Sequence, residues 1–145
     1  MVGSLTEKVT IDIEKILAAF RVLQERVEHV IVEGTGGWLV PIRSDYFVSD
    51  LAVAMKLPIV VVAQNRLGCL NHAVLTVRSI AAHELKCAGL VLNSTETTGG
   101  IAALTNADIL KRILEVPLLV GLGENLTELP VDWRLMLESA TQSPC

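Results

Sequence analysis

The stretch Ile59-Val60-Val61-Val62-Ala63 is an uninterrupted apolar run, and all but its last residue are β-branched. β-branched side chains favour extended backbone, and a strand without polar alternation is typical of a parallel sheet that is covered on both faces. Leu57-Pro58 lies just before the run, where a proline ends a preceding helix. The run therefore predicts a strand that is buried on both faces within an α/β fold.

Helical and extended segments alternate on both sides of this strand. Apolar residues recur from Val9 to Val27 at a spacing of about 3.6, which predicts an amphipathic helix. Ser4 and Glu7 have the spacing of a capping box at its start, and Asp45 is placed to cap the next helix. The predicted helices cover residues 5–28, 46–56, 70–85 and 131–138, with another that is capped within 105–108 and ends at 114, and the predicted strands cover residues 29–33, 59–63, 87–93 and 117–121. This alternation predicts a parallel sheet flanked by helices, in a single domain over residues 1–145.

The length and composition fit one globular domain that neither crosses a membrane nor binds nucleic acid. A chain of 145 residues buries about 68–70% of the surface that it exposes when unfolded. Its apolar runs are shorter than the ~20 residues that a membrane-spanning helix needs. The 16 acidic residues outnumber the 12 basic ones, so no basic patch for a polyanion is predicted. No secretory signal opens the sequence, and we therefore expect a cytoplasmic protein.

The three cysteines are Cys69, Cys87 and Cys145, an odd number at irregular spacing. Such a set argues against a disulfide framework and for reduced thiols. Cys69 and His72 form a C-x-x-H pair, but the sequence has no second pair that would complete a tetrahedral zinc site. Zinc is therefore not expected.

Polar and glycine-rich segments follow the predicted strands. The carboxyl ends of parallel strands lie at one edge of the sheet, where open α/β folds bind their ligands. These segments are Glu33, residues 64–68, Asn93-Ser94 and residues 121–125, and we expect them to share that edge. Each also has a local interpretation: Glu33 pairs on the surface, the glycines only form turns, and Asn93 satisfies loop backbone.

Glu33 stands where a predicted strand gives way to a glycine-rich loop, and three of the next four residues are glycine. A carboxylate is the kind of hard oxygen ligand that Mg²⁺ prefers. Glycines at 34, 36 and 37 let the backbone turn tightly and approach a ligand closely. The stretch therefore predicts one half of a nucleotide site. The pattern of the other half, the phosphate-binding G-x-x-x-x-G-K-[ST], does not occur in this sequence.

A second glycine, Gly68, opens directly into a predicted helix that contains Leu70, Asn71 and His72. The first N–H groups of a helix are unpaired and partly positive, so they favour a carboxylate or phosphate. An ordinary helix start with a solvated His72 is the simpler interpretation. No acidic residue is placed to orient His72 as a general base.

Three segments stand in a specific order: Val32-Glu33-Gly34-Thr35-Gly36-Gly37-Trp38, then Leu67-Gly68-Cys69-Leu70-Asn71-His72-Ala73 with Leu75-Thr76, then Ala88-Gly89-Leu90-Val91-Leu92-Asn93. Together they resemble one enzyme family, dethiobiotin synthetase. Their order and spacing are much more specific than a lone glycine motif. The resemblance covers nearly the whole chain, but only about the C-terminal two-thirds of the family's length.

The resemblance implies an ATP- and Mg²⁺-dependent ligase of biotin biosynthesis, a homodimer that closes a ureido ring on 7,8-diaminononanoate with CO₂. Glu33 would be the magnesium ligand, and Asn93 would hydrogen-bond adenine with Ser94 beside it. Leu70 and Asn71 would hold the substrate carboxylate across the dimer interface. The remaining residues that the resemblance places at the nucleotide or substrate are Gly34, Thr35, Gly36, Gly123, Glu124 and Asn125, although the family's usual proline is missing from the last loop.

The resemblance also implies a doubly wound fold like that of the P-loop NTPases, with its first strand missing. The family's phosphate loop, its catalytic lysines and a second magnesium-binding aspartate precede the region found here, and residues 1–28 match none of them. We therefore expect a fragment, a mis-started frame or half of a split protein, inactive by itself. The alternatives are a non-catalytic binding or regulatory homologue that lost the phosphate loop, and a partitioning-type ATPase-like domain.

Overall fold

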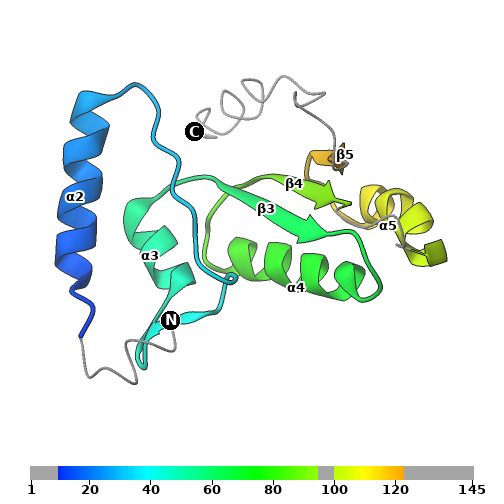
Figure 1. Ribbon diagram of the computed structural model, residues 1–145, viewed down its shortest axis with the longest axis horizontal. Coiled ribbons are helices and arrows are strands. Elements are labelled where there is room, and N and C mark those ends of the chain that lie inside the picture. The colour runs from blue at the N-terminus through cyan, green and yellow to red at the C-terminus, as the bar shows by residue number, and fades with distance from the viewer. Residues whose placement is uncertain (1–9, 95–99, 123–145) are drawn as a thin grey trace. The chain divides into compact units, whose positions relative to one another are not determined.

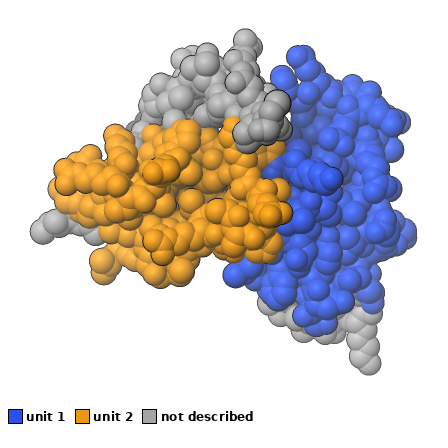
Figure 2. All heavy atoms as spheres, turned by 180° about the vertical axis from the view of Figure 1, so that it is seen from behind, with its two compact units in different colours: residues 1–57 blue, residues 58–145 orange. Residues whose placement is uncertain are grey.

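The computed structural model describes residues 10–94 and 100–122, and it divides the chain into two compact units (Figures 1 and 2). Unit 1 comprises residues 1–57 and unit 2 comprises residues 58–145. Two compact units can belong to one domain, so the single domain over residues 1–145 stays a prediction. In the described ranges, no helix combines the length and the apolar character needed to cross a membrane.

Unit 2 contains a parallel sheet of three strands in the order β3-β4-β5. The strands are β3 (Ile59–Gln64), β4 (Cys87–Asn93) and β5 (Leu118–Leu122). Helix α4 (Cys69–Ala82) connects β3 to β4, and α5 (Gly100–Ile113) precedes β5. The predicted strand–helix alternation and the parallel sheet are thus confirmed for residues 59–122, with β4 at its predicted bounds.

The core of unit 2 lies between the sheet and helices α4 and α5 (Figure 1). Leu90 and Leu92 of β4 are fully buried, and so is Leu110 of α5. Cys69 and Ala73 belong to the same cluster, so Cys69 packs in the core while His72 is exposed. The C-x-x-H pair therefore does not converge on one point.

The expectation that β3 is covered on both faces is wrong. Val61 and Ala63 pack on the core, whereas Val60 and Val62 are 44% and 66% exposed. Successive side chains of a strand point to opposite faces, and among the described strands β3 pairs only with β4. The central strand β4, buried from Ala88 to Leu92, has the burial on both faces that was expected of β3.

The first described element of unit 1 is helix α2 (Ile13–Arg26), which buries Ile13 and Phe20 on one side. The helical periodicity predicted this element, but its start is not at residue 5, because residues 10–12 are not helical. Asp12 is the N-cap, and its carboxylate accepts a hydrogen bond from the Lys15 N–H at 3.3 Å. The predicted Ser4–Glu7 capping box lies outside the described residues.

The strand predicted for residues 29–33 does not form, and these residues have no regular structure. A strand needs a neighbour for its backbone N–H and C=O groups, and the ladders of the described strands do not include residues 29–33. Unit 1 instead has a short hairpin of β1 (Pro41–Arg43) and β2 (Tyr46–Phe47), followed by helix α3 (Val48–Met55).

Two predicted helix starts are also wrong. Asp45 does not cap α3; the Asp50 carboxylate accepts the Phe47 N–H at 2.7 Å, and Asp45 pairs with Arg43. Helix α5 begins at Gly100, so residues 105–108 lie inside it. Asn106 belongs to the segment that was expected to cap the helix, but tertiary hydrogen bonds hold it in mid-helix. The helix predicted for residues 131–138 lies outside the described residues.

Candidate functional site

The carboxyl ends of β3 and β4 meet, as the sequence predicted for residues 64–68 and Asn93. Gln64 is in register with Asn93, and the Asn65 N–H donates to the Asn93 carbonyl oxygen at 2.8 Å. On the other side of β4, Asn93 is in register with Leu122, the last residue of β5. The backbone of unit 2 therefore brings three strand ends to one edge of the sheet.

Two buried asparagines join this edge to helix α5. Asn65 and Asn106 are only 8% and 3% exposed. The Asn106 Nδ2 donates to Asn65 Oδ1 at 3.0 Å and to the Arg66 carbonyl oxygen at 3.3 Å. The Asn65 Nδ2 donates to Ser94 Oγ at 3.2 Å and to the Ala103 carbonyl oxygen at 3.0 Å. These four hydrogen bonds link the loop after β3, the residue after β4 and two turns of α5.

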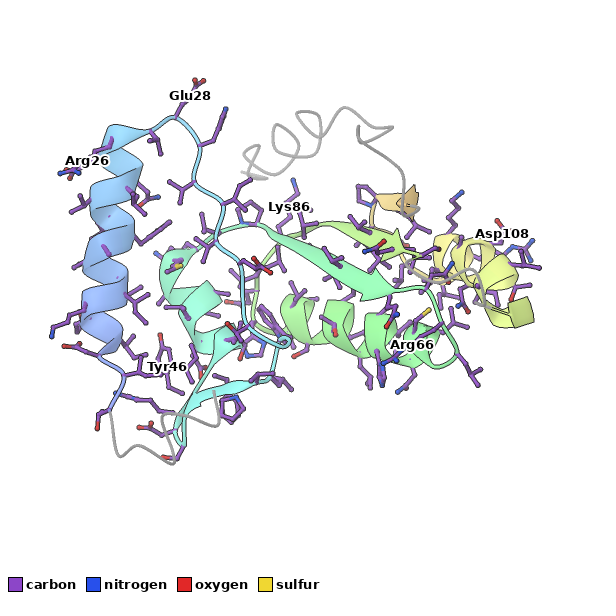
Figure 3. The ribbon with its side chains drawn as sticks, viewed as in Figure 1. Arg26, Glu28, Tyr46, Arg66, Lys86 and Asp108 are labelled. Atoms are coloured by element: carbon purple, nitrogen blue, oxygen red, sulfur yellow. The ribbon has the colours of Figure 1, made fainter. Side chains whose placement is uncertain are left out.

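Neither asparagine was singled out from the sequence as a site residue. Asn65 belongs to the polar segment 64–68, and Asn106 belongs to the segment 105–108 that predicts a helix cap. A signal for Asn106 does exist, because it lies four residues before Leu110 and therefore on the same, apolar face of the helix. A polar side chain on an apolar helix face needs a buried partner. One such partner of Asn106 is the backbone carbonyl oxygen of Arg66. Figure 3 shows Arg66 in the loop between β3 and α4.

Gly68 is the N-cap of helix α4 and adopts the left-handed conformation with φ of 90°. This conformation favours glycine, because other side chains are strained there. The Cys69 N–H already donates to the Arg66 carbonyl oxygen at 3.1 Å. Leu70 packs its side chain against the core, while Asn71 is exposed in the first turn. An anion at this helix start would therefore meet the Asn71 amide and backbone groups, and not the Leu70 side chain.

In unit 1 the glycine-rich loop lies against the start of α3. A Cβ added at Gly34 would meet Val48 Cγ1 at 3.0 Å, which explains why glycine suits this position. Gly36 and Gly37 have positive φ values of 81° and 149°. The loop then joins α3 through the Ser49 N–H, which donates to the Trp38 carbonyl oxygen at 3.0 Å.

Glu33, Thr35 and Gly36 are all exposed in this loop. Across the described residues, no three His, Cys, Asp or Glu side chains gather into a group that could hold a metal ion by themselves. A lone exposed carboxylate still fits Mg²⁺, which keeps several waters and takes one or two carboxylates together with substrate phosphates. Glu33 lies in unit 1 and Asn93 in unit 2, and Gly123, Glu124 and Asn125 lie outside the described residues.

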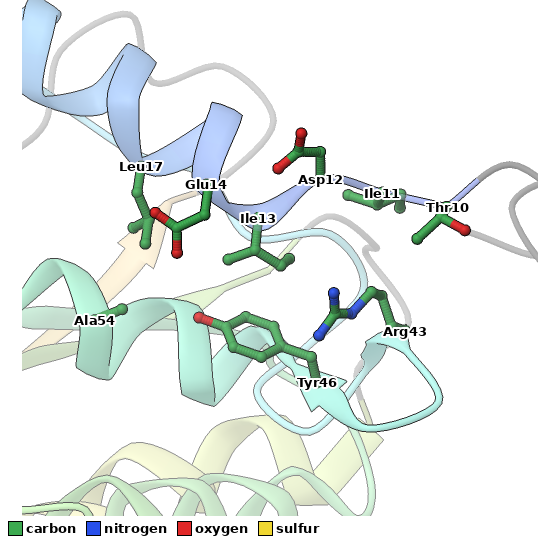
Figure 4. Close-up of a pocket in the computed structure, with 9 residues that line it drawn as sticks. All are labelled: Thr10, Ile11, Asp12, Ile13, Glu14, Leu17, Arg43, Tyr46 and Ala54. Carbon is green, nitrogen blue, oxygen red and sulfur yellow. The ribbon is translucent and has the colours of Figure 1, made fainter.

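A hollow of about 620 Å³ opens in unit 1 beside the start of α2 (Figure 4). The Arg43 guanidinium lies 5.6 Å from the centre of the Tyr46 ring, and its Nε is 3.2 Å from Asp45 Oδ1. Burial raises the pKa of Tyr46, and the Asp50 and Glu14 carboxylates add to the rise while Arg43 opposes it. Of the residues predicted for the site, those that the structure describes do not line this hollow.

The two described cysteines are free thiols, in agreement with the prediction of reduced cysteines. Cys69 is buried in the core, and Cys87 begins β4 at the end opposite Asn93. Burial raises the pKa of the Cys87 thiol, with a smaller opposite effect from a hydrogen bond with the Gly89 backbone. Neither thiol is therefore suited to act as a nucleophile at the carboxyl edge of the sheet.

Comparison with known proteins gives the same result as the motifs. The family described as AAA domain matches residues 4–128. An ATP-dependent dethiobiotin synthetase of Thermodesulfovibrio yellowstonii is 36% identical, over 91% of this chain and 58% of its own length. The protein of the same name from Aromatoleum aromaticum is 41% identical over 81% of this chain and 52% of its own length. The one from Xanthomonas axonopodis pv. citri is 44% identical over 61% of this chain and 39% of its own length. The resemblance to dethiobiotin synthetase is thus confirmed, and the chain spans about half the length of these curated relatives.

Proposed function

The chain belongs to the AAA domain family, and from its similarity to ATP-dependent dethiobiotin synthetases we propose that it is part of such an enzyme. The single observation that carries the proposal beyond sequence similarity is the meeting of Asn93 and Ser94 with the loop after β3. Open α/β sheets bind their ligands at this edge. The proposed reaction is the ATP- and Mg²⁺-dependent closure of the ureido ring of dethiobiotin in biotin biosynthesis.

In this reaction one amine of 7,8-diaminononanoate takes up CO₂ as a carbamate, and ATP phosphorylates the carbamate. The second amine then displaces phosphate and closes the ring, so the products are dethiobiotin, ADP and phosphate. Phosphoryl transfer depends mostly on positioning and on neutralisation of charge. The protein's task is therefore to orient the amines and the nucleotide, and Mg²⁺ supplies charge neutralisation when it is bound.

We assign Glu33 to Mg²⁺, and Gly34, Thr35 and Gly36 to the nucleotide or substrate. Their exposure in unit 1 is compatible with contacts to a ligand. Asn93 and Ser94 would contact adenine. The loop Gly123-Glu124-Asn125 would flank the base or ribose, and Leu70 and Asn71 would hold the substrate carboxylate through backbone N–H groups and the Asn71 amide, across a homodimer interface. We place the enzyme in the cytoplasm.

The test is the synthesis of dethiobiotin by the complete product of the gene. We expect purified protein to form dethiobiotin and phosphate in equal amounts when Mg-ATP, 7,8-diaminononanoate and bicarbonate are supplied, as mass spectrometry and a phosphate assay measure. Reactions without diaminononanoate are the control. Binding of both substrates without product would contradict the ligase and favour a non-catalytic homologue.

The 145-residue chain by itself is expected to turn over very little, because its sequence has no G-x-x-x-x-G-K-[ST] pattern to hold phosphates. We propose that a phosphate-binding loop with this pattern, together with a strand that pairs with β3, completes the site. The strand order supports this, since among the described strands β3 pairs only with β4 and its other edge has room for a further strand. Turnover by the 145-residue chain equal to that of the complete product would contradict it.

A further inference from the structure

The hydrogen bonds of Asn65 leave its side-chain amide only one orientation. Its Nδ2 donates to Ser94 Oγ and to the Ala103 carbonyl oxygen, and its Oδ1 accepts from Asn106. A flipped amide would set Nδ2 against the Asn106 donor and Oδ1 against a carbonyl oxygen. The burial of both asparagines excludes the water that could otherwise replace these bonds.

This fixed amide acts on two neighbouring groups. Because Ser94 Oγ accepts from Asn65, the Ser94 hydroxyl proton is directed elsewhere and remains available as a donor. The Asn65 N–H holds the Asn93 carbonyl oxygen at 2.8 Å, which sets the direction of the chain where β4 ends. Asn65 thus fixes the backbone direction at Asn93 and the direction of the Ser94 hydroxyl proton.

Asn106 is the group that holds Asn65 in place. It lies on α5, 40 and 41 residues along the chain from its two partners, and it donates to Asn65 Oδ1 and to the Arg66 carbonyl oxygen. Without it, an acceptor on each of these residues would be left buried and the Asn65 amide could rotate. Asn106 does not belong to the strand ends themselves, so its role is to support them.

We propose that Asn106 is a positioning residue that, through Asn65, orients Asn93 and Ser94 to recognise the purine of the bound nucleotide. This inference rests on the proposed function, in which those two residues contact adenine. Adenine offers ring-nitrogen acceptors and an amino donor, whereas guanine has a carbonyl oxygen in place of the amino group. A site that presents one fixed set of donors and acceptors discriminates between the two bases.

The test compares ATP with GTP binding to the complete gene product by calorimetry. Replacing Asn106 with alanine should weaken ATP binding about tenfold and GTP binding much less, so that the preference for ATP falls. The matched control is Asp108→Ala, an exposed position on the same helix, which should leave both affinities unchanged. A merely structural role would lower the folded fraction and affect both nucleotides equally.

A second measurement uses the unmodified protein, so its result does not depend on how well Asn106→Ala folds. In nuclear magnetic resonance spectra, the side-chain amide signals of Asn65 and Asn106 should shift on addition of ATP, and less on addition of GTP. An unchanged preference in Asn106→Ala, or amide signals that respond to neither nucleotide, would overturn the inference while ATP binding still supports the proposed function. An unmodified protein that binds no ATP would overturn both.

Discussion

The carboxyl edge of β3 and β4 and the glycine-rich loop at residues 33–37 have similar sequences, since each places polar residues and glycine after an apolar run. They differ in how they are held. At the first, a parallel ladder and the buried Asn65 and Asn106 fix both backbone and side chains. At the second, residues 29–33 join no ladder among the described strands, and Glu33 is exposed. An apolar run becomes a strand where a neighbouring strand satisfies its backbone, and its residues alone do not decide this.

The largest effect should come from the core beneath the carboxyl edge. Leu92 is 0% exposed, and Leu92→Ala should lower the free energy of unfolding by about 3 kcal/mol, because it leaves a cavity. The control is Leu67→Ala in the loop after β3, where the side chain is 87% exposed and the cost should be below about 0.5 kcal/mol. Urea denaturation measures both, and equal costs would mean that the edge is not anchored by this core.

The second effect tests the glycine-rich loop in the complete protein. Glu33→Gln should reduce Mg-ATP-dependent formation of dethiobiotin about 100-fold, because the amide is a much poorer magnesium ligand than the carboxylate. Glu28→Gln is the control, since Glu28 is also exposed in unit 1 and lies outside the loop. Raising the Mg²⁺ concentration should partly restore the variant, and unchanged turnover would remove Glu33 from the site.

The third effect concerns the stability that the buried amides give to the carboxyl edge. Asn106→Ala should lower the free energy of unfolding by about 2 kcal/mol, because Asn65 Oδ1 and the Arg66 carbonyl oxygen lose their donor while buried. Asp108→Ala should change it by less than about 0.5 kcal/mol. If urea denaturation gave the two variants the same stability, the amides would not distinguish this edge from the exposed loop.

The smallest effect separates backbone strain from packing at a glycine. A Cβ at Gly68 would meet nothing within 4 Å, so Gly68→Ala should cost only its strained left-handed backbone, about 1 kcal/mol. Asparagine tolerates this conformation better, and Gly68→Asn should therefore cost less than Gly68→Ala. Thermal melting of the two variants measures the difference, and a larger cost for asparagine would show that space, not backbone, requires glycine here.

Local patterns in the sequence predicted several elements well. The continuous run at Ile59–Ala63 predicted β3, and Cys87–Asn93 matches β4 at both ends, because apolar content and β-branching act within each segment. Helix starts were less predictable. Asp12, Asp50 and Asn106 are all residue types that cap helices, and the chain alone does not say which of them does so.

By itself, the sequence determined the family and, in unit 2, the alternation of strands and helices and the meeting of strand ends at one edge, since these depend on the order of residues and on general rules of parallel sheets. Tertiary structure alone decided that Val62 is exposed, that residues 29–33 stay outside the ladders of the described strands, and that Asn106 is buried against Asn65. The physical reason is common to all three. Burial and hydrogen-bond satisfaction depend on which distant segment lies alongside, and in unit 2 the partners of Asn106 come from 40 and 41 residues away along the chain.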